Sequence, residues 1–144
     1  MRVSELMHTP AVTCRPEAAI GDVARLMRDR NVGSVIVVDG IGYLAGIVTD
    51  RDVAVRGVGE GLSADVAVEE IMSRNVATIP LQADVSHAAG LMVKRTVRRL
   101  PVVDENDIPH GMLTLDDLVR QIGRDADAVS DTVMLQAANL SHGP

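Results

Sequence analysis

The chain reads GIVTDRD at Gly46–Asp52 and GMLTLDD at Gly111–Asp117, so both stretches carry the pattern Gly-x-x-Thr-x-x-Asp. The repetition extends on both sides, because residues 3–61 overlay residues 68–126 at a constant offset of 65 without a gap. Sixteen positions are identical along that overlay. Two diverged copies of one structural unit therefore make up most of the 144-residue protein.

Within each copy the spacing of apolar residues predicts a short helical lead-in followed by the order β-α-β-β-α. In the first copy these elements fall at 3–7, 11–14, from Ile20 onward, and at 35–39, 44–49 and 50–56. In the second copy they fall at 68–72, 76–79, from Val85 onward, and at 100–104, 111–114 and 115–122. Asp84 stands where it can cap the helix that begins at Val85. The expected fold class is α/β, of the mixed α+β kind.

The repetition sets the expected domain organisation. The first repeat covers 1–61, a linker 62–67, the second repeat 68–125 and a tail 126–144. Gly57–Ala64 is glycine-rich, which predicts a flexible connector about 8 residues long. The tail is expected to form a docking helix with a frayed, disordered end. Because half-chains of this size bury little apolar surface, we expect the two halves to fold against each other.

Composition argues against several classes of function. A net charge of −6 and a single aromatic side chain, Tyr43, disfavour binding of DNA or RNA. No stretch is long and apolar enough to cross a membrane, and Met1–Glu5 lacks the apolar core of a signal peptide, so a soluble cytoplasmic protein is expected. Cys14, the single cysteine, is expected to be a small buried apolar residue. The four histidines show no metal-ligand spacing, so no metal site is predicted.

The repeated motif places a hydroxyl and a carboxylate three residues apart, where a strand passes into a helix. A helix N-terminus favours an anion such as phosphate, and the Thr49 hydroxyl can add a donor. Asp52 could accept hydrogen bonds from the hydroxyls of a ribose, and Gly46 keeps the approach free of a side chain. The structural alternative is that Thr49 and Thr114 are helix N-caps, with Asp52 and Asp117 serving as the acidic partners of a capping box.

With Val32–Asp39 and Val97–Asp104 ahead of the two motifs, the chain resembles a tandem pair of cystathionine β-synthase (CBS) domains, often called a Bateman module. The resemblance covers about residues 2–124 and leaves no separate catalytic domain. It implies two repeats packed about a pseudo-twofold axis, with clefts between them for adenosine-containing ligands. AMP, ADP, ATP or S-adenosylmethionine would be regulatory ligands, and no cofactor would be required. The resemblance also implies a homodimer.

The resemblance assigns roles to individual positions. Thr49 and Thr114 match the phosphate-facing hydroxyl, and Asp52 and Asp117 match the ribose-binding acid. The surroundings of the adenine and the phosphate are expected to comprise Thr13, Cys14, Ser34, Val35, Gly46, Arg51, Thr78, Ile79, Arg98, Arg99 and Gly111.

The two sites are not expected to be equivalent. The second copy alone carries a basic cluster made of Lys94, Arg95, Arg98 and Arg99. Such a cluster would attract an anionic phosphate, although Arg51 and Arg56 could serve the first motif. The alternative for the cluster is a solvated helix end, where basic residues are common.

These observations predict a non-enzymatic sensor that binds an adenine nucleotide. Binding would alter the association of the protein with a second copy or with an unidentified client protein. The alternative is a ligand-free module for dimerisation or protein interaction. A small hydrolase or transferase would need a general base and an activated nucleophile, and the sequence offers no such pair.

Overall fold

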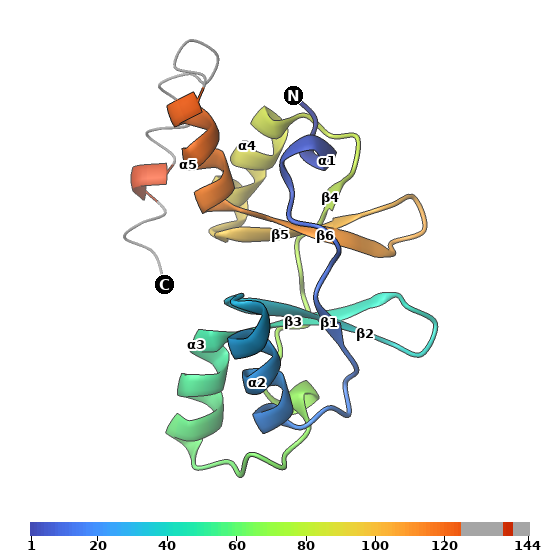
Figure 1. The fold of residues 1–144 in the computed structure, drawn as a ribbon, viewed down its shortest axis with the longest axis vertical. Helices are drawn as coiled ribbons and strands as arrows, with labels where there is room; N and C mark the ends of the chain where they lie inside the picture. The colour runs from blue at the N-terminus through green and yellow to red at the C-terminus, as the bar shows by residue number, and fades with distance from the viewer. Residues whose placement is uncertain (125–136, 140–144) are drawn as a thin grey trace. The chain divides into compact units, whose positions relative to one another are not determined.

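The computed structural model describes residues 1–124 and 137–139. The elements of the first repeat are α1 (Val3–Leu6), β1 (Thr13–Cys14), α2 (Ile20–Arg30), β2 (Ser34–Val38), β3 (Leu44–Thr49), α3 (Asp50–Asp52), a π-helical turn (Val53–Gly57) and a 3₁₀ turn (Val58–Glu60). Those of the second are a 3₁₀ turn (Val68–Glu70), β4 (Ile79–Pro80), α4 (Val85–Arg95), β5 (Arg99–Val103), β6 (Pro109–Thr114) and α5 (Leu115–Arg124). The predicted mixed α/β fold class is confirmed (Figure 1). The tail predicted at 126–144 lies outside the described residues, apart from 137–139, which are helical.

Each repeat builds a three-stranded sheet, in the order β1-β2-β3 or β4-β5-β6. The first two strands of each sheet run parallel, as β1 with β2 and β4 with β5. β2 and β3 form an antiparallel hairpin whose register sets Ser34 opposite Thr49. The two main helices of each repeat cover one face of its sheet (Figure 1). In the first repeat the apolar stripe of α2 packs on Val35, Val37 and Val48, as its 3.6-residue periodicity requires.

The chain divides into two compact units whose boundaries differ from those of the sequence repeats. One, here the repeat-1 unit, comprises 11–76 and 106–109, and the other, the repeat-2 unit, comprises 1–10, 77–105 and the residues from 110 onward. Val3 is fully buried in the core of the repeat-2 unit, and Val68 is fully buried in the core of the repeat-1 unit. The lead-in turn of the first repeat therefore completes the core of the repeat-2 unit. The lead-in turn of the second repeat completes the core of the repeat-1 unit.

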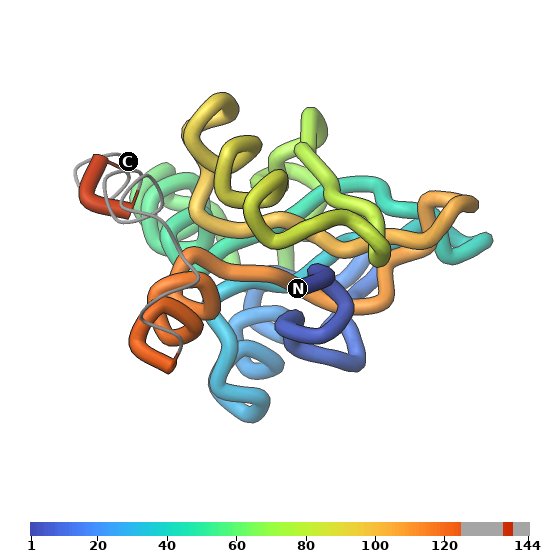
Figure 2. The backbone as a smooth tube through the Cα atoms, turned by 90° about the horizontal axis from the view of Figure 1, so that it is seen from above, coloured from blue at the N-terminus to red at the C-terminus, as the bar shows by residue number. Residues whose placement is uncertain are grey.

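Backbone hydrogen bonds fix both exchanged lead-ins. The N–H of Val3 donates to the Ala83 carbonyl at 2.8 Å, and the N–H of Val68 donates to the Ala18 carbonyl at 2.7 Å. Further along, His8 and Met112 exchange two hydrogen bonds of 2.9 and 3.0 Å. Figure 2 shows the resulting placement of the dark blue α1 segment beside the orange strand β6.

Ser73 repeats this arrangement in the repeat-1 unit, exchanging hydrogen bonds of 2.9 and 3.0 Å with Ile47. The glycine of each motif lies directly against the segment that is held in this way. A Cβ on Gly46 would lie 2.7 Å from the Ser73 carbonyl oxygen, and one on Gly111 would lie 2.8 Å from the Met7 sulfur and press on the His8 carbonyl. The close approach of the polypeptide to itself accounts for these two glycines, whereas the sequence suggested that Gly46 makes room for a ligand.

The predicted cap of α4 is confirmed. The Asp84 carboxylate accepts hydrogen bonds from the Ser86 N–H at 2.9 Å and from the Ser86 hydroxyl at 2.8 Å. The backbone N–H of Ser86, then its hydroxyl and the N-terminal amine, hold the pKa of Asp84 below its usual value.

The glycine-rich connector is helical over its first half. Gly57 closes the π-helical turn, Val58–Glu60 form a 3₁₀ turn, and Gly61 ends it in the left-handed region with φ +73°. The segment predicted to be a flexible connector, Gly57–Ala64, therefore forms helical turns as far as Glu60. Among the described residues, no helix is long and apolar enough to cross a bilayer.

The C-terminal ends of α2 and α4 are built alike from different residues. Asn31 and Thr96 both adopt the left-handed conformation with φ 53°. The N–H of the following valine, Val32 or Val97, donates to a helix carbonyl at 3.0 Å. Asparagine tolerates this conformation, whereas a β-branched threonine is strained in it.

Replacing Thr96→Asn should therefore stabilise the protein by about 1 kcal/mol, because the left-handed conformation costs an ordinary residue roughly 1–2 kcal/mol. Both positions are exposed, so packing should not confound the comparison. Thermal unfolding should show an increase of about 3 °C for Thr96→Asn and a decrease for the reciprocal Asn31→Thr. Equal midpoints for Thr96→Asn and the wild type would show that the cap is not strained.

Gly111→Ala should destabilise the protein by about 1–3 kcal/mol, the cost of overpacking a filled contact. Gly90→Ala is the matched control, because Gly90 lies inside α4 with no atom within 4 Å of an added Cβ. That control should gain about 0.5–1 kcal/mol from the better helix propensity of alanine. Urea unfolding of both variants measures the difference, and a Gly111→Ala variant as stable as wild type would contradict the close packing described above.

Candidate ligand-binding site

The first motif forms a reciprocal capping box where β3 passes into α3. The Thr49 hydroxyl accepts a hydrogen bond from the Asp52 N–H at 3.1 Å, and the Oδ2 atom of Asp52 accepts one from the Thr49 N–H at 2.9 Å. The other carboxylate oxygen, Oδ1, has the Nε of Arg56 at 3.8 Å, which is beyond hydrogen-bond distance. One oxygen of Asp52 thus closes the cap, and the other accepts no hydrogen bond from the described residues.

The second motif forms the same capping box between Thr114 and Asp117, with distances of 2.8 and 3.2 Å. It differs in one partner, because the Nε2 atom of His8 lies 2.6 Å from Oδ1 of Asp117. The Asp117 side chain is 5% exposed, against 16% for Asp52. Both oxygens of the second carboxylate are therefore engaged within the protein.

The difference follows from substitutions at equivalent positions. At an offset of 65 residues, His8 corresponds to Ser73, and Arg56 corresponds to Gln121. Backbone hydrogen bonds hold His8 and Ser73 in the same way. The two motifs therefore differ at this position only in the side chain. No role was expected for His8 from the sequence, because the four histidines show no metal-ligand spacing. The signal that could have found His8 is its overlay on Ser73, adjacent to the repeated Met7 and Met72.

Three of the other predicted residues, Thr13, Cys14 and Ser34, lie on β1 and β2. Ser34 is buried and pairs with Thr49 across the β2–β3 hairpin, while the exposed Thr13 lies on β1. The side chain of Cys14 packs against the core, and burial raises the pKa of its thiol to about 11. Cys14 is therefore protonated at neutral pH, and it is half-buried against the core where full burial was expected.

Val35 and Ile79 are fully buried in the cores of their units, and Thr78 beside Ile79 is half-buried. Both residues are 0% exposed, backbone included, so neither presents an atom to a ligand in this structure. The side chains that can surround an adenine are therefore fewer than the resemblance implies.

The basic residues predicted around the two motifs lie mostly at the surface. Arg51, Lys94, Arg95 and Arg98 are exposed, and Arg99 is half-buried at the start of β5. The carbonyl of Arg98 accepts a hydrogen bond from the N–H of Leu115 at 2.8 Å, which ties the basic cluster to the start of α5. Gly33 makes the equivalent bond to Asp50 at 2.9 Å, without a basic side chain. At this bond the second motif therefore carries an arginine where the first carries a glycine.

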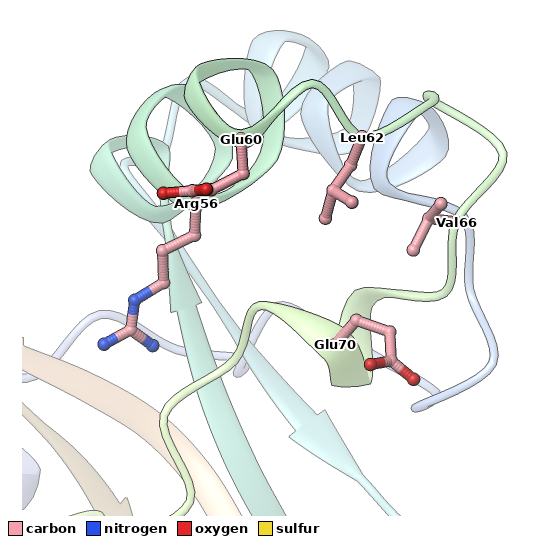
Figure 3. Close-up of a pocket in the computed structure, with 5 residues that line it drawn as sticks. All are labelled: Arg56, Glu60, Leu62, Val66 and Glu70. Atoms are coloured by element: carbon pink, nitrogen blue, oxygen red, sulfur yellow. The ribbon is translucent and has the colours of Figure 1, made fainter.

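The repeat-1 unit also contains an open hollow of about 720 Å³. Figure 3 shows the residues that line it, Arg56, Glu60, Leu62, Val66 and Glu70. Neither Thr49 nor Asp52 lines this hollow, and only Arg56 connects it with the first motif. Its two carboxylates make it a poor receptor for an anionic phosphate.

Comparison with known proteins identifies the family. The CBS domain model matches residues 3–58 and again residues 68–124. The CBS domain-containing protein YhcV of Bacillus subtilis is 34% identical over 141 residues, which cover 97% of this chain and 95% of the relative.

Two solved structures share the fold. The CBS domain pair of protein MJ0100, in complex with 5′-methylthioadenosine and S-adenosyl-L-methionine, superposes with a TM-score of 0.79 at 30% identity, covering 86% of this chain and 97% of that one. The CBS domain protein PAE2072 from Pyrobaculum aerophilum, complexed with AMP, gives 0.77 at 25% identity, covering 96% and 99%. The resemblance noted in the sequence is confirmed by these matches, and the chain belongs to the CBS domain family as a tandem pair of CBS domains.

Proposed function

We propose that this CBS pair is a regulatory sensor that binds an adenosine-containing ligand, AMP, ADP, ATP or S-adenosylmethionine, at one or both Thr-x-x-Asp motifs. The observation that carries the proposal is the likeness to two CBS structures that hold 5′-methylthioadenosine with S-adenosyl-L-methionine, or AMP. The ligands of those relatives share an adenosine group, so the proposal names that group as the part recognised.

The motif retains the atoms that such recognition needs. Each threonine hydroxyl accepts a hydrogen bond from the aspartate N–H, which leaves its own proton available to donate to a phosphate oxygen. Oδ1 of Asp52 can accept a hydrogen bond from a ribose hydroxyl without breaking the cap, because the cap uses Oδ2. The basic cluster of Lys94, Arg95, Arg98 and Arg99 would favour an anionic ligand at the second motif.

In this proposal the ligand acts through conformation and not through turnover. A differential affinity for two arrangements of the protein worth about 1–3 kcal/mol would suffice to alter association with a second copy, as a homodimer, or with a client protein. The described hydrogen bonds place no nucleophile against the ring of His8, whose nitrogen contacts Asp117. We therefore expect a non-enzymatic protein that leaves its nucleotide chemically intact. We expect it to act in the cytoplasm.

One observation favours a second candidate, a ligand-free module for dimerisation or protein interaction. Both motifs form complete capping boxes, so Thr49, Asp52, Thr114 and Asp117 already have a structural role. Sedimentation with and without nucleotide separates the two functions. A ligand-free module would associate identically in both conditions, whereas a sensor would change its association or its shape.

The sensor should show a selective rise in unfolding temperature with one ligand from a panel of AMP, ADP, ATP, S-adenosylmethionine and 5′-methylthioadenosine. A ligand present at 100 times its dissociation constant adds about 2.7 kcal/mol of stability, a shift of several degrees for a chain of this size. Asp52→Ala or Asp117→Ala should weaken binding at its own motif by about 1.5–3 kcal/mol, the value of a hydrogen bond to a charged group.

Asp116→Ala is the matched control, since Asp116 is an exposed acid adjacent to Asp117 and its loss changes the net charge equally. The capping role of Asp52 and Asp117 will also lower the unfolding temperature without ligand, so the ligand-induced increments must be compared. No increment with any compound of the panel would refute the sensor. An increment that both Asp→Ala variants retain in full would refute the assigned ribose contacts.

A further inference from the structure

The two motif carboxylates differ in what they can still accept. Asp52 has one oxygen outside hydrogen-bond distance of any described donor, since the Nε of Arg56 stays at 3.8 Å. The guanidinium of Arg56 is directed elsewhere, because its Nη1 donates to the Ile71 carbonyl at 3.3 Å. Asp117 has no such oxygen, because the Thr114 N–H and the His8 ring occupy one oxygen each.

Resting on the proposed function, we propose that His8 is a built-in competitor for the ribose at the second motif. A ribose hydroxyl can reach Oδ1 of Asp117 only when the imidazole leaves, because the side chain is only 5% exposed with the ring in place. The first motif is then the tighter nucleoside site. The second fills only at the expense of the His8–Asp117 contact.

The geometry allows this displacement without unfolding. The backbone of His8 is fixed by its two hydrogen bonds with Met112, and Gly111 packs beneath it. The His8 side chain is 64% exposed, so its ring can turn into solvent by a rotamer change while the backbone stays in place. The carboxylate, by contrast, is held by the capping box. His8 is therefore the movable partner of the pair, and Asp117 the fixed one.

The overlay of the repeats supplies the experiment, because Ser73 is the residue that the first motif carries in place of His8. AMP is titrated calorimetrically into an Asp52→Ala protein, in which only the second motif is intact, and into the same protein with His8→Ser. Removing the competitor should tighten AMP binding by about tenfold or more, the equivalent of a hydrogen bond to a charged group. In an Asp117→Ala background, Ser73→His should weaken AMP binding at the first motif.

His87→Ser is the matched control, since His87 is exposed on α4 and should leave AMP affinity unchanged. The ring resonances of His8 should also shift when AMP saturates the second motif, which a merely structural histidine would not show. Equal AMP affinity with and without His8→Ser, together with unshifted resonances, would overturn the competitor while leaving the sensor intact. Absence of binding of AMP and of every other compound in the panel, from all of these proteins and from the wild type, would overturn both.

Discussion

The burial of Val3 and Val68 in cores built by the other repeat is the contact on which the rest of the fold depends. A fully buried valine contributes roughly 1.5–3 kcal/mol, and each is accompanied by a backbone hydrogen bond to the loop before a helix. These contacts direct the residues after Val3 to β6, where His8 pairs with the strand. They direct the residues after Val68 to β3, where Ser73 pairs with the strand. The need for a glycine in each motif, the capping box and the position of His8 all depend on this path of the backbone.

The Thr-x-x-Asp motif combines two roles that sequence reasoning treats as alternatives. The capping box uses one carboxylate oxygen and the acceptor side of the hydroxyl, while the remaining oxygen and the hydroxyl proton are separate atoms. A cap worth about 1 kcal/mol and a ligand contact can therefore coexist in four residues. The cap also holds the carboxylate in one orientation before a ligand arrives, which reduces the entropy lost on binding. In the second motif the contact of His8 with Asp117 offsets part of this entropic advantage.

Patterns among neighbouring residues predicted the features that depend on neighbouring residues, namely the helices, the strands and a helix cap. The spacing of apolar residues located α2, α4 and the strands of both sheets, and Asp84 was correctly identified as a cap. The exchange of lead-ins was not predictable in this way, because an apolar turn such as Val3–Leu6 fits either core equally well. Pairing of His8 with Asp117 joins residues 109 apart in sequence, and no periodicity reports such a contact. Burial of Val35 and Ile79 was missed because the resemblance carries positions over without their side-chain directions.

The exchanged lead-ins also order the events of biosynthesis. Chains emerge from the ribosome N-terminus first, at about 5–20 residues per second. Nearly all of the repeat-1 unit lies between residues 11 and 76, so its core can close as soon as Met72 is available. The segment that carries Val3 is made before the repeat-1 unit, yet it must remain unpaired until β4, α4 and β6 have followed. Residues made before the repeat-1 unit thus reach their final contacts after it has closed.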